Sequence, residues 1–331
     1  MNFIDTEVAP LGMGCWPIGG EMYSDDGSSL GYTNSDDKES IRTIHAALAN
    51  GITLFDTAAA YGAGHSERLL AKALKNRPES QLITKIGIAI NEDNKQLSFD
   101  DIAPAAVIPA IDACLSRLKR ERIDLLLLHC NDMSVEVAGP LFDQMEVALE
   151  AGKIKSFGWS TDFTDRVDAM AGRSRFMAVE HAMNVLADAA DMQRTIEKHR
   201  LTALIRSPLA MGLLSGKYTQ GSAIPPNDVR AGQQGWLDYY IDGRPNPAFL
   251  QRYEAVTELL QTGGRTPVQG ALGWLWAKGK RNIPIPGART VTQIEGLAAA
   301  LEFGELPAVV MAEIETLIVR DSGIDGEQRA R

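Results

Sequence analysis

Cysteine is scarce in this chain of 331 residues, which contains only Cys15, Cys114 and Cys130. An odd number of scattered cysteines argues against a disulfide scaffold and indicates a reducing compartment. The three cysteines and the five histidines show no zinc-ligand spacing, so we expect no metal site. A chain of this length can bury a full core without disulfides or a structural metal.

Positive charge is also in short supply. Lysine and arginine total 33 against 43 for aspartate and glutamate, which gives a net charge of -10. Such a field repels polyphosphate, so we expect no nucleic-acid partner. The basic run RLKRER (117–122) is interpreted as a solvated helix end.

Long hydrophobic runs are missing as well. No apolar segment approaches the roughly 20 residues that a membrane-spanning helix needs. The N-terminal stretch MNFIDTEVAP carries acidic residues and no basic region, unlike a secretory signal. We therefore expect no membrane association and a cytoplasmic location.

Short apolar runs alternate with amphipathic stretches along the chain. Nearly continuous apolar runs are typical of strands covered on both faces. Strands are predicted at 52–57, 81–86, 124–130, 154–159, 176–181, 201–207 and 282–287, with a weaker eighth at 301–303. Helices are predicted at about 36–50, 66–77, 104–120, 138–151, 164–172, 189–199, 249–261, 267–278, 291–299 and 307–319. Strand and helix repeated about eight times predict a (β/α)₈ TIM barrel, as a single domain over 1–331, in preference to an open doubly wound sheet.

Two long segments, 17–35 and 215–248, fall outside this repeat and are rich in glycine, proline and polar residues. Loops of this length in a compact domain are often lids or binding loops. The alternative is a disordered surface insertion. The last residues, 321–331, are expected to fray.

Familiar phosphate-binding signatures are incomplete. In GMGCWPIGG (12–20), Pro17 takes the place of the third glycine of a dinucleotide-binding fingerprint. GLLSGKY (212–218) has three residues between its glycines instead of four, and Tyr218 follows the lysine. The sequence also contains no G-x-S-x-G elbow.

Polar groups stand at three consecutive predicted strand ends. Asp56 and Tyr61 follow the first strand, Lys85 ends the second, and His129 ends the third. Functional groups of barrels lie at the C-terminal ends of the strands, so we expect these four to meet. A lone tyrosine or histidine is more often structural, but an unpaired Asp or Lys in an apolar strand is costly.

The four groups make a coherent chemical set. A tyrosine has a pKa of roughly 10, and a nearby ammonium lowers that value. A carboxylate keeps the lysine charged, and an imidazole can hydrogen-bond a carbonyl oxygen. The set predicts a proton donor aimed at an oxygen that becomes negative during reduction.

The residues around this set resemble the aldo-keto reductase superfamily. The resemblance lies in LFDTAAAYGAGHSERLLAKAL (54–74), ITK (83–85) and IDLLLLH (123–129). It extends to LGMGCW (11–16), GWSTDF (158–163), SPLAMGLLSGKY (207–218) and IPGARTVTQIE (285–295). These strings cover nearly the whole chain in the order found in the family.

The resemblance implies a barrel that binds NADP(H), less often NAD(H), and transfers hydride reversibly between the nicotinamide and a small-molecule carbonyl. Tyr61 would be the general acid, tuned by Asp56 and Lys85, and His129 would orient the carbonyl. Trp236 in the second long loop would contact substrate together with Tyr61 and His129.

The same resemblance implies a set of cofactor contacts. They are Gly14, Cys15, Trp16, Asp56, Ser160, Thr161, Glu180, Arg206, Ser207, Pro208, Leu209, Gly212, Gly287, Ala288, Arg289 and Gln293. Ser160 would contact the carboxamide, and Arg206 would pack against the nicotinamide ring. Arg289 would pair with a 2′-phosphate, or is an arginine at the start of a surface helix.

Some positions depart from the family pattern. Thr161 stands where asparagine is common, and Glu180 stands where glutamine is common. Gln293 and Leu297 replace an arginine and an asparagine that are frequent in NADPH-selective members, which leaves the choice between NADP and NAD open.

Two other functions remain alternatives. One is a cofactor-binding regulatory or sensor module with little turnover, which tight cofactor retention without steady-state turnover would reveal. The other is an unrelated lyase or isomerase that uses Lys85 as a Schiff base, which borohydride trapping would reveal. The sequence fixes neither the substrate nor the oligomeric state.

Overall fold

A curled sheet of eight parallel strands forms the centre of the computed structural model, which describes residues 1–100, 102–318 and 320. The strand order is β14-β11-β10-β9-β8-β5-β4-β3. The strands are β3 (Met13–Gly14), β4 (Leu54–Asp56), β5 (Gln81–Ile86), β8 (Leu125–Leu128), β9 (Phe157–Ser160), β10 (Phe176–Ala182), β11 (Thr202–Arg206) and β14 (Asn282–Pro284). The predicted (β/α)₈ barrel is confirmed.

The barrel closes between β3 and the segment that follows β14. Gly14 pairs with Gly287 in a parallel bridge, and the Gly14 amide donates to the Pro286 carbonyl at 3.0 Å. A Cβ on Gly14 would lie 2.5 Å from the Ile285 carbonyl oxygen. The close approach of the two backbones therefore requires glycine at position 14.

The prediction of an eighth strand at 301–303 is wrong. These residues belong to the short helix α11 (Ala300–Phe303), and β3 takes the eighth place in the barrel. A short apolar run cannot be assigned to strand or helix by its periodicity, and the two residues of β3 are too few to show any.

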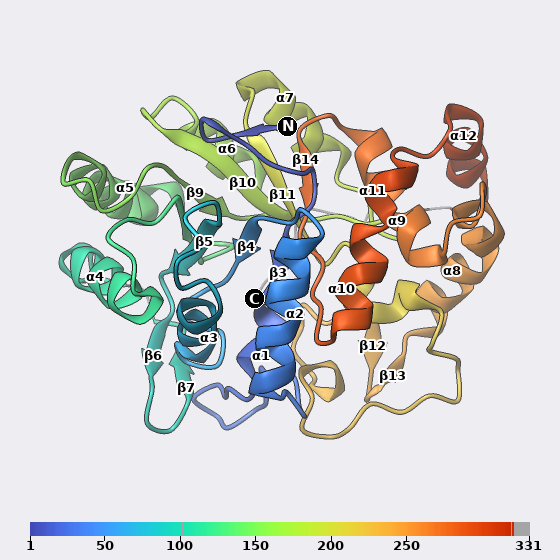
Figure 1. Ribbon diagram of the computed structural model, residues 1–331, viewed down its shortest axis with the longest axis horizontal. Helices are drawn as coiled ribbons and strands as arrows, with labels where there is room; N and C mark the ends of the chain where they lie inside the picture. Colours follow the sequence, from blue (N-terminus) through green and yellow to red (C-terminus); the bar gives the residue numbers. More distant parts are fainter. Residues whose placement is uncertain (101, 319, 321–331) are drawn as a thin grey trace.

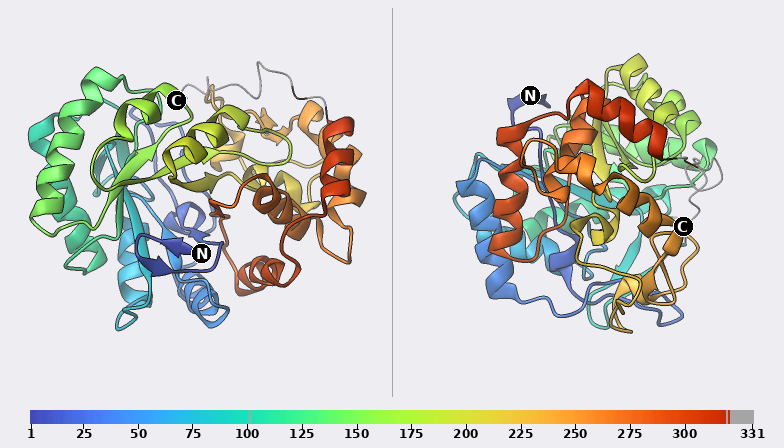
Figure 2. Two further views of the ribbon diagram at one scale, coloured as in Figure 1. Left: turned by 90° about the horizontal axis from the view of Figure 1, so that it is seen from above. Right: turned by 90° about the vertical axis from the view of Figure 1, so that its right-hand side faces the viewer.

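Helices surround the sheet, as Figures 1 and 2 show. They are α1 (Trp16–Gly19), α2 (Asp37–Ala49), α3 (His65–Ala73), α4 (Val107–Leu118), α5 (Val135–Glu150), α6 (Thr164–Met170), α7 (Ala190–His199), α8 (Pro247–Leu260), α9 (Pro267–Lys278), α10 (Val291–Ala298), α11 and α12 (Ala308–Leu317). Caps fix several starts: Asp36 accepts from the Glu39 amide at the start of α2, and Thr266 and Gln269 form a capping box on α9. Among the described residues, no helix is long and apolar enough to cross a membrane.

The core has an outer layer between sheet and helices and an inner layer inside the barrel. The inner layer joins side chains from the beginnings of the strands, including Leu54, Ile83 and Leu125. Phe3 and Ile4, from the hairpin of β1 (Asn2–Phe3) and β2 (Thr6–Glu7), pack on the same layer. The N-terminal hairpin thus plugs the end of the barrel at which the strands begin (Figure 2).

The two long loops meet each other. The Val229 amide donates to the Gly31 carbonyl at 2.8 Å, and the Ser29 hydroxyl donates to the Asn227 carbonyl at 2.6 Å. Segment 215–248 contains the short helix η3 (Val229–Ala231) and the hairpin of β12 (Tyr240–Ile241) and β13 (Arg244–Pro245). It is therefore a structured loop. The predicted frayed tail, 321–331, lies outside the described residues.

Candidate active site

Alternation along the strands separates an apolar layer from a polar layer inside the barrel. Asp56 follows Leu54 by two residues on β4, and Lys85 follows Ile83 by two on β5. Residues two apart on a strand point to the same face. The polar side chains therefore stand one layer above the inner core, at the ends of the strands.

Lys85 is the centre of this polar layer and is completely buried. Its Nζ donates to both oxygens of Asp56, at 2.7 and 2.8 Å, and to the Thr57 carbonyl at 3.0 Å. It also donates to the Tyr61 hydroxyl at 3.1 Å. The structure thus brings the predicted acid, phenol and amine into direct contact.

A fourth group approaches the same ammonium. Glu180 on β10 places Oε2 3.2 Å from Lys85 Nζ, and the Ser160 hydroxyl donates to Oε1 at 3.4 Å. Sequence reasoning assigned Glu180 to the cofactor site but did not foresee this ion pair. The parallel register of β10 and β9 pairs Glu180 with Ser160 and so places the Glu180 carboxylate in the polar layer.

The pKa values of the cluster reflect burial and three neighbouring charges. Burial alone would lower the pKa of Lys85, but the Asp56 and Glu180 carboxylates outweigh it and raise that pKa. Burial raises the pKa of Asp56, and the Glu180 carboxylate raises it further against the effect of Lys85. Lys85 therefore remains an ammonium ion held between two carboxyl groups.

The expectation that the ammonium lowers the pKa of Tyr61 needs correction. Burial raises the pKa of Tyr61 above its ordinary value. Lys85 acts in the opposite direction, but the charges of Asp56 and Glu180 add to the effect of burial. The net pKa is therefore raised, and the phenol keeps its proton over the neutral range.

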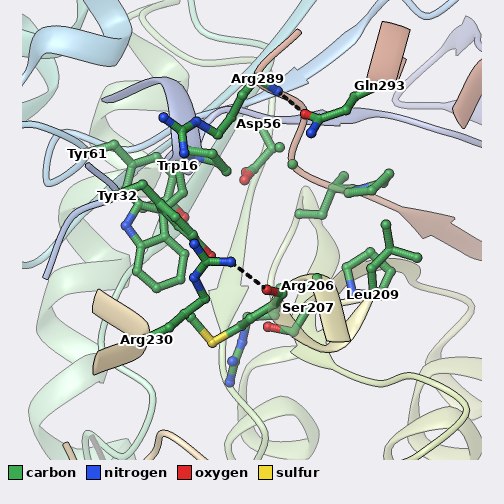
Figure 3. Close-up of a pocket in the computed structure, with 18 of the residues that line it drawn as sticks. Trp16, Tyr32, Asp56, Tyr61, Arg206, Ser207, Leu209, Arg230, Arg289 and Gln293 are labelled. Atoms are coloured by element: carbon green, nitrogen blue, oxygen red, sulfur yellow. Dashed lines mark hydrogen bonds between the residues drawn. The ribbon is translucent and has the colours of Figure 1, made fainter. Parts of the chain in front are cut away.

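A cavity of about 870 Å³ opens above the cluster, and Figure 3 shows ten of its lining residues labelled. Trp16 stacks on the ring of Tyr61 with 6.0 Å between centroids, and Trp236 lies 6.1 Å from Trp16. His129 meets the Tyr61 ring edge-on at 6.0 Å. Tyr61, His129 and Trp236 thus line one pocket with an aromatic wall.

Most of the predicted cofactor contacts also line this pocket. They are Gly14, Trp16, Asp56, Ser160, Glu180, Arg206, Ser207, Pro208, Leu209, Gly212, Gly287, Arg289 and Gln293. Three are not brought to its wall: Cys15, Thr161 and Ala288 are each fully buried in the core. The Thr161 hydroxyl instead donates to the Asn131 carbonyl at 2.6 Å.

Arg206, at the end of β11, is held by Asp162, which follows β9. The second carboxylate oxygen of Asp162 accepts from the Ala182 amide at 2.7 Å. This pairing fixes a guanidinium at the pocket wall while balancing its charge. Sequence reasoning missed Asp162, because no pattern in the sequence shows that it pairs with the distant Arg206.

Arg289 connects the start of α10 to the first long loop. Its guanidinium donates to the carbonyls of Thr33 and Asn34, and its backbone amide donates to Gln293 Oε1 at 2.8 Å. Burial lowers the pKa of Arg289, and the nearby Arg230 lowers it further. Two guanidinium groups therefore share this part of the pocket, which suits a polyanionic ligand.

Arg230 is the lining residue that sequence reasoning missed most clearly. Asp228 holds its guanidinium in two parallel hydrogen bonds of 2.8 and 2.9 Å, and Tyr218 accepts another at 2.6 Å. The Tyr32 ring lies 5.1 Å from the guanidinium. Only tertiary structure could reveal this residue, because it sits in a loop without periodicity.

The residues present fit a nicotinamide dinucleotide. The Tyr61–Lys85 pair places an ionisable phenol at one part of the pocket, and Arg230 and Arg289 place guanidinium groups at another. Gly14 and Gly287, which form the parallel bridge that closes the barrel, line the same pocket. A dinucleotide with a reactive ring and an anionic diphosphate needs this combination.

Comparison with known proteins gives consistent matches. The model of the aldo/keto reductase family matches residues 10–319. Aldo-keto reductase YhdN of Bacillus subtilis (strain 168) is 29% identical over 301 residues, covering 88% of this chain and 85% of that protein. Aldo-keto reductase yakc of Schizosaccharomyces pombe, whose name specifies NADP(+), is 26% identical over 305 residues, covering 89% of this chain and 84% of that protein.

A solved structure matches the fold closely. The glycerol dehydrogenase AKR11B4 from Gluconobacter oxydans superposes with a TM-score of 0.78 at 26% sequence identity. The match covers 95% of this chain and 92% of that one.

Proposed function

The chain belongs to the aldo/keto reductase family, and from that premise we propose that it uses NADP(H) to reduce the carbonyl of a small aldehyde or ketone, reversibly. The observation that carries the proposal is the 3.1 Å hydrogen bond between Lys85 Nζ and the Tyr61 hydroxyl at the pocket wall. A buried phenol beside a permanent ammonium can give up a proton and be stabilised as the phenolate.

Each residue of the cluster has a role in that proton transfer. Tyr61 donates its proton to the carbonyl oxygen as negative charge develops there, and Lys85 stabilises the phenolate that remains. Asp56 keeps Lys85 charged and directed at the phenol through its two hydrogen bonds. His129, beside the Tyr61 ring, orients the carbonyl oxygen. The bound dihydronicotinamide would supply hydride to the carbonyl carbon.

The proposed cofactor is NADP(H), with NAD(H) as the alternative. Arg230 and Arg289 offer guanidinium groups to the phosphates. The Schizosaccharomyces pombe relative, named for NADP(+), lends further support. Gln293, which accepts from the Arg289 amide, is uncharged and adds no cation for a 2′-phosphate.

The pocket favours a substrate with an apolar body. Trp16 and Trp236 face the site together with apolar side chains such as Leu30 and Ile88. Aromatic side chains offer large apolar contact areas to planar ligands. We therefore propose an aromatic or similarly apolar aldehyde as the best simple substrate.

The variant Tyr61→Phe tests the proton-donor role. It deletes the hydroxyl that Lys85 contacts and keeps the ring that stacks on Trp16. We expect kcat for NADPH-dependent reduction of benzaldehyde to fall by about 100-fold or more, while NADPH still quenches protein fluorescence with an unchanged dissociation constant.

The control is Tyr253→Phe, which removes a phenol from α8 outside the pocket and should leave kcat unchanged. Retained turnover in Tyr61→Phe would contradict the proton-donor role. Tight NADPH binding without turnover in the wild-type protein would instead favour the sensor module.

A further inference from the structure

Glu180 occupies a position from which it can act on both Lys85 and the cofactor. It lies in the middle of β10, is 2% exposed, and lines the pocket. One carboxylate oxygen lies 3.2 Å from Lys85 Nζ, and the other accepts from the Ser160 hydroxyl at 3.4 Å. A glutamine of the same shape could accept from Ser160 equally well, so what distinguishes a glutamate here is its charge.

The charges around this end of the pocket do not balance. Two cations, Lys85 and Arg206, face three carboxyl groups, which belong to Asp56, Asp162 and Glu180. Asp162 neutralises Arg206, and Asp56 alone suffices to neutralise Lys85 through its two hydrogen bonds. Glu180 is therefore the carboxyl group in excess of the two cations.

An unbalanced carboxylate affects the two redox states of a nicotinamide differently. The oxidised ring is a cation, whereas the dihydronicotinamide is neutral. In a site from which bulk water is largely excluded, a fixed carboxylate attracts the cation and leaves the neutral ring almost unaffected. The carboxamide, ribose and phosphates are common to both states, so contacts to them cancel in the ratio of the two affinities.

We propose that Glu180 sets the redox preference of the pocket by selectively stabilising the bound oxidised cofactor. The inference rests on the proposed function, because it requires the nicotinamide ring to lie beside this cluster. It makes Glu180 a positioning and electrostatic residue distinct from the proton donor. Its consequence is that the bound reduced cofactor becomes a stronger hydride donor, which shifts the equilibrium on the enzyme toward carbonyl reduction.

The test compares the dissociation constants of NADP+ and NADPH in the wild-type protein and in Glu180→Gln. Both are measured by fluorescence titration or calorimetry in the same buffer at the same pH. We expect the ratio of the NADP+ constant to the NADPH constant to rise on the order of tenfold in the variant, as one charge near a cationic ring is lost. The change should arise almost entirely from weaker NADP+ binding.

The matched control is Glu39→Gln, the same chemical change at another position of the same pocket. Glu39, on α2, accepts from the Val291 amide at 3.0 Å at the start of α10, away from Lys85. It should change both constants by the same factor and leave their ratio unaltered. Thermal unfolding of each variant establishes that it is folded.

Two results would overturn the inference separately from the proposed function. If Glu180→Gln binds both cofactor forms with an unchanged ratio, Glu180 does not set the redox preference, although the reductase function stands. If the wild-type protein binds neither NADP(H) nor NAD(H), the proposed function fails and the inference fails with it.

Discussion

Trp236 is one of the side chains through which the second long loop reaches the pocket. It belongs to segment 215–248 and lies 6.1 Å from Trp16, which stacks on Tyr61. An aromatic contact of this kind contributes about 1 kcal/mol beyond the area it buries. The indole is therefore expected to bind the body of an aromatic substrate and to take no part in proton transfer.

Trp236→Ala should raise KM for benzaldehyde by about tenfold, because the substrate loses one aromatic contact and the apolar area buried in it. Propanal, which is too small to cover the indole, serves as the internal control, and its kcat/KM should change little. Steady-state kinetics with the two aldehydes measures both effects. An equal loss with both substrates would place Trp236 in the chemistry or in the fold instead of in substrate recognition.

Among single residues, the sequence predicted those that stand at the ends of strands. Asp56, Lys85 and His129 end or follow apolar runs, so the convergence of their side chains followed from the barrel. Arg230 and Asp162 could not be predicted, because their roles depend on partners brought together only by folding. The net pKa of Tyr61 was also beyond reach, since burial and Glu180 oppose the effect of Lys85.

The shortest strand of the barrel is also the one that closes it. Strand β3 has two residues, and Gly14 approaches the chain after β14 so closely that no side chain fits. The sequence predicted seven of the strands from their apolar runs. It placed the eighth wrongly, because closure depends on a backbone contact that hydrophobic periodicity does not record.

Gly14→Ala should destabilise the protein by about 1–3 kcal/mol, the usual cost of an added carbon in a packed site. The new Cβ would meet the Ile285 carbonyl oxygen at 2.5 Å, and one of the two backbones would have to move. Urea unfolding followed by circular dichroism measures the change.

The matched control is Gly139→Ala in α5, where an added Cβ meets nothing within 4 Å. This change should be neutral or stabilise the protein by about 0.5–1 kcal/mol, because alanine is the better helix former. If Gly14→Ala and Gly139→Ala change the free energy of unfolding by the same amount, the close backbone contact at Gly14 does not hold the barrel closed.

At the scale of the whole molecule, two loops from opposite parts of the sequence contribute to one site. Segments 17–35 and 215–248 are joined through Gly31 and Val229, and Arg289 ties the first of them to α10. The sequence predicted two long binding loops from their length and composition. Their contact with each other could not be predicted, because it lies between residues about 200 positions apart and leaves no local pattern.

The whole chain is acidic, yet two arginines line the pocket. Arg230 and Arg289 line the pocket of a protein of net charge -10, and Lys85 is completely buried on β5. Overall charge excluded nucleic acid as an expected partner, but it says little about a pocket that is lined by selected charges. Inside the barrel, Lys85 is paired with Asp56 and Glu180, and this local arrangement is independent of the net charge of the chain.

If Tyr61 exchanges the proton, as proposed, reduction and oxidation should depend on pH in opposite ways. Reduction needs the protonated phenol, so it is lost only as the pH rises through the pKa of Tyr61. Oxidation needs the phenolate, so its rate rises with pH up to that same value. Because the pKa of Tyr61 is raised, the turning point should lie above the ordinary tyrosine value of about 10.

The decisive measurement is kcat/KM for benzaldehyde reduction and for benzyl alcohol oxidation from neutral to strongly alkaline pH. We expect a flat reduction profile through the neutral range and an oxidation rate that increases about tenfold per pH unit. Both dependences should be absent from the residual activity of Tyr61→Phe. A reduction rate that already falls near neutral pH would contradict the proton-donor role of Tyr61. So would the same pH dependence in Tyr61→Phe.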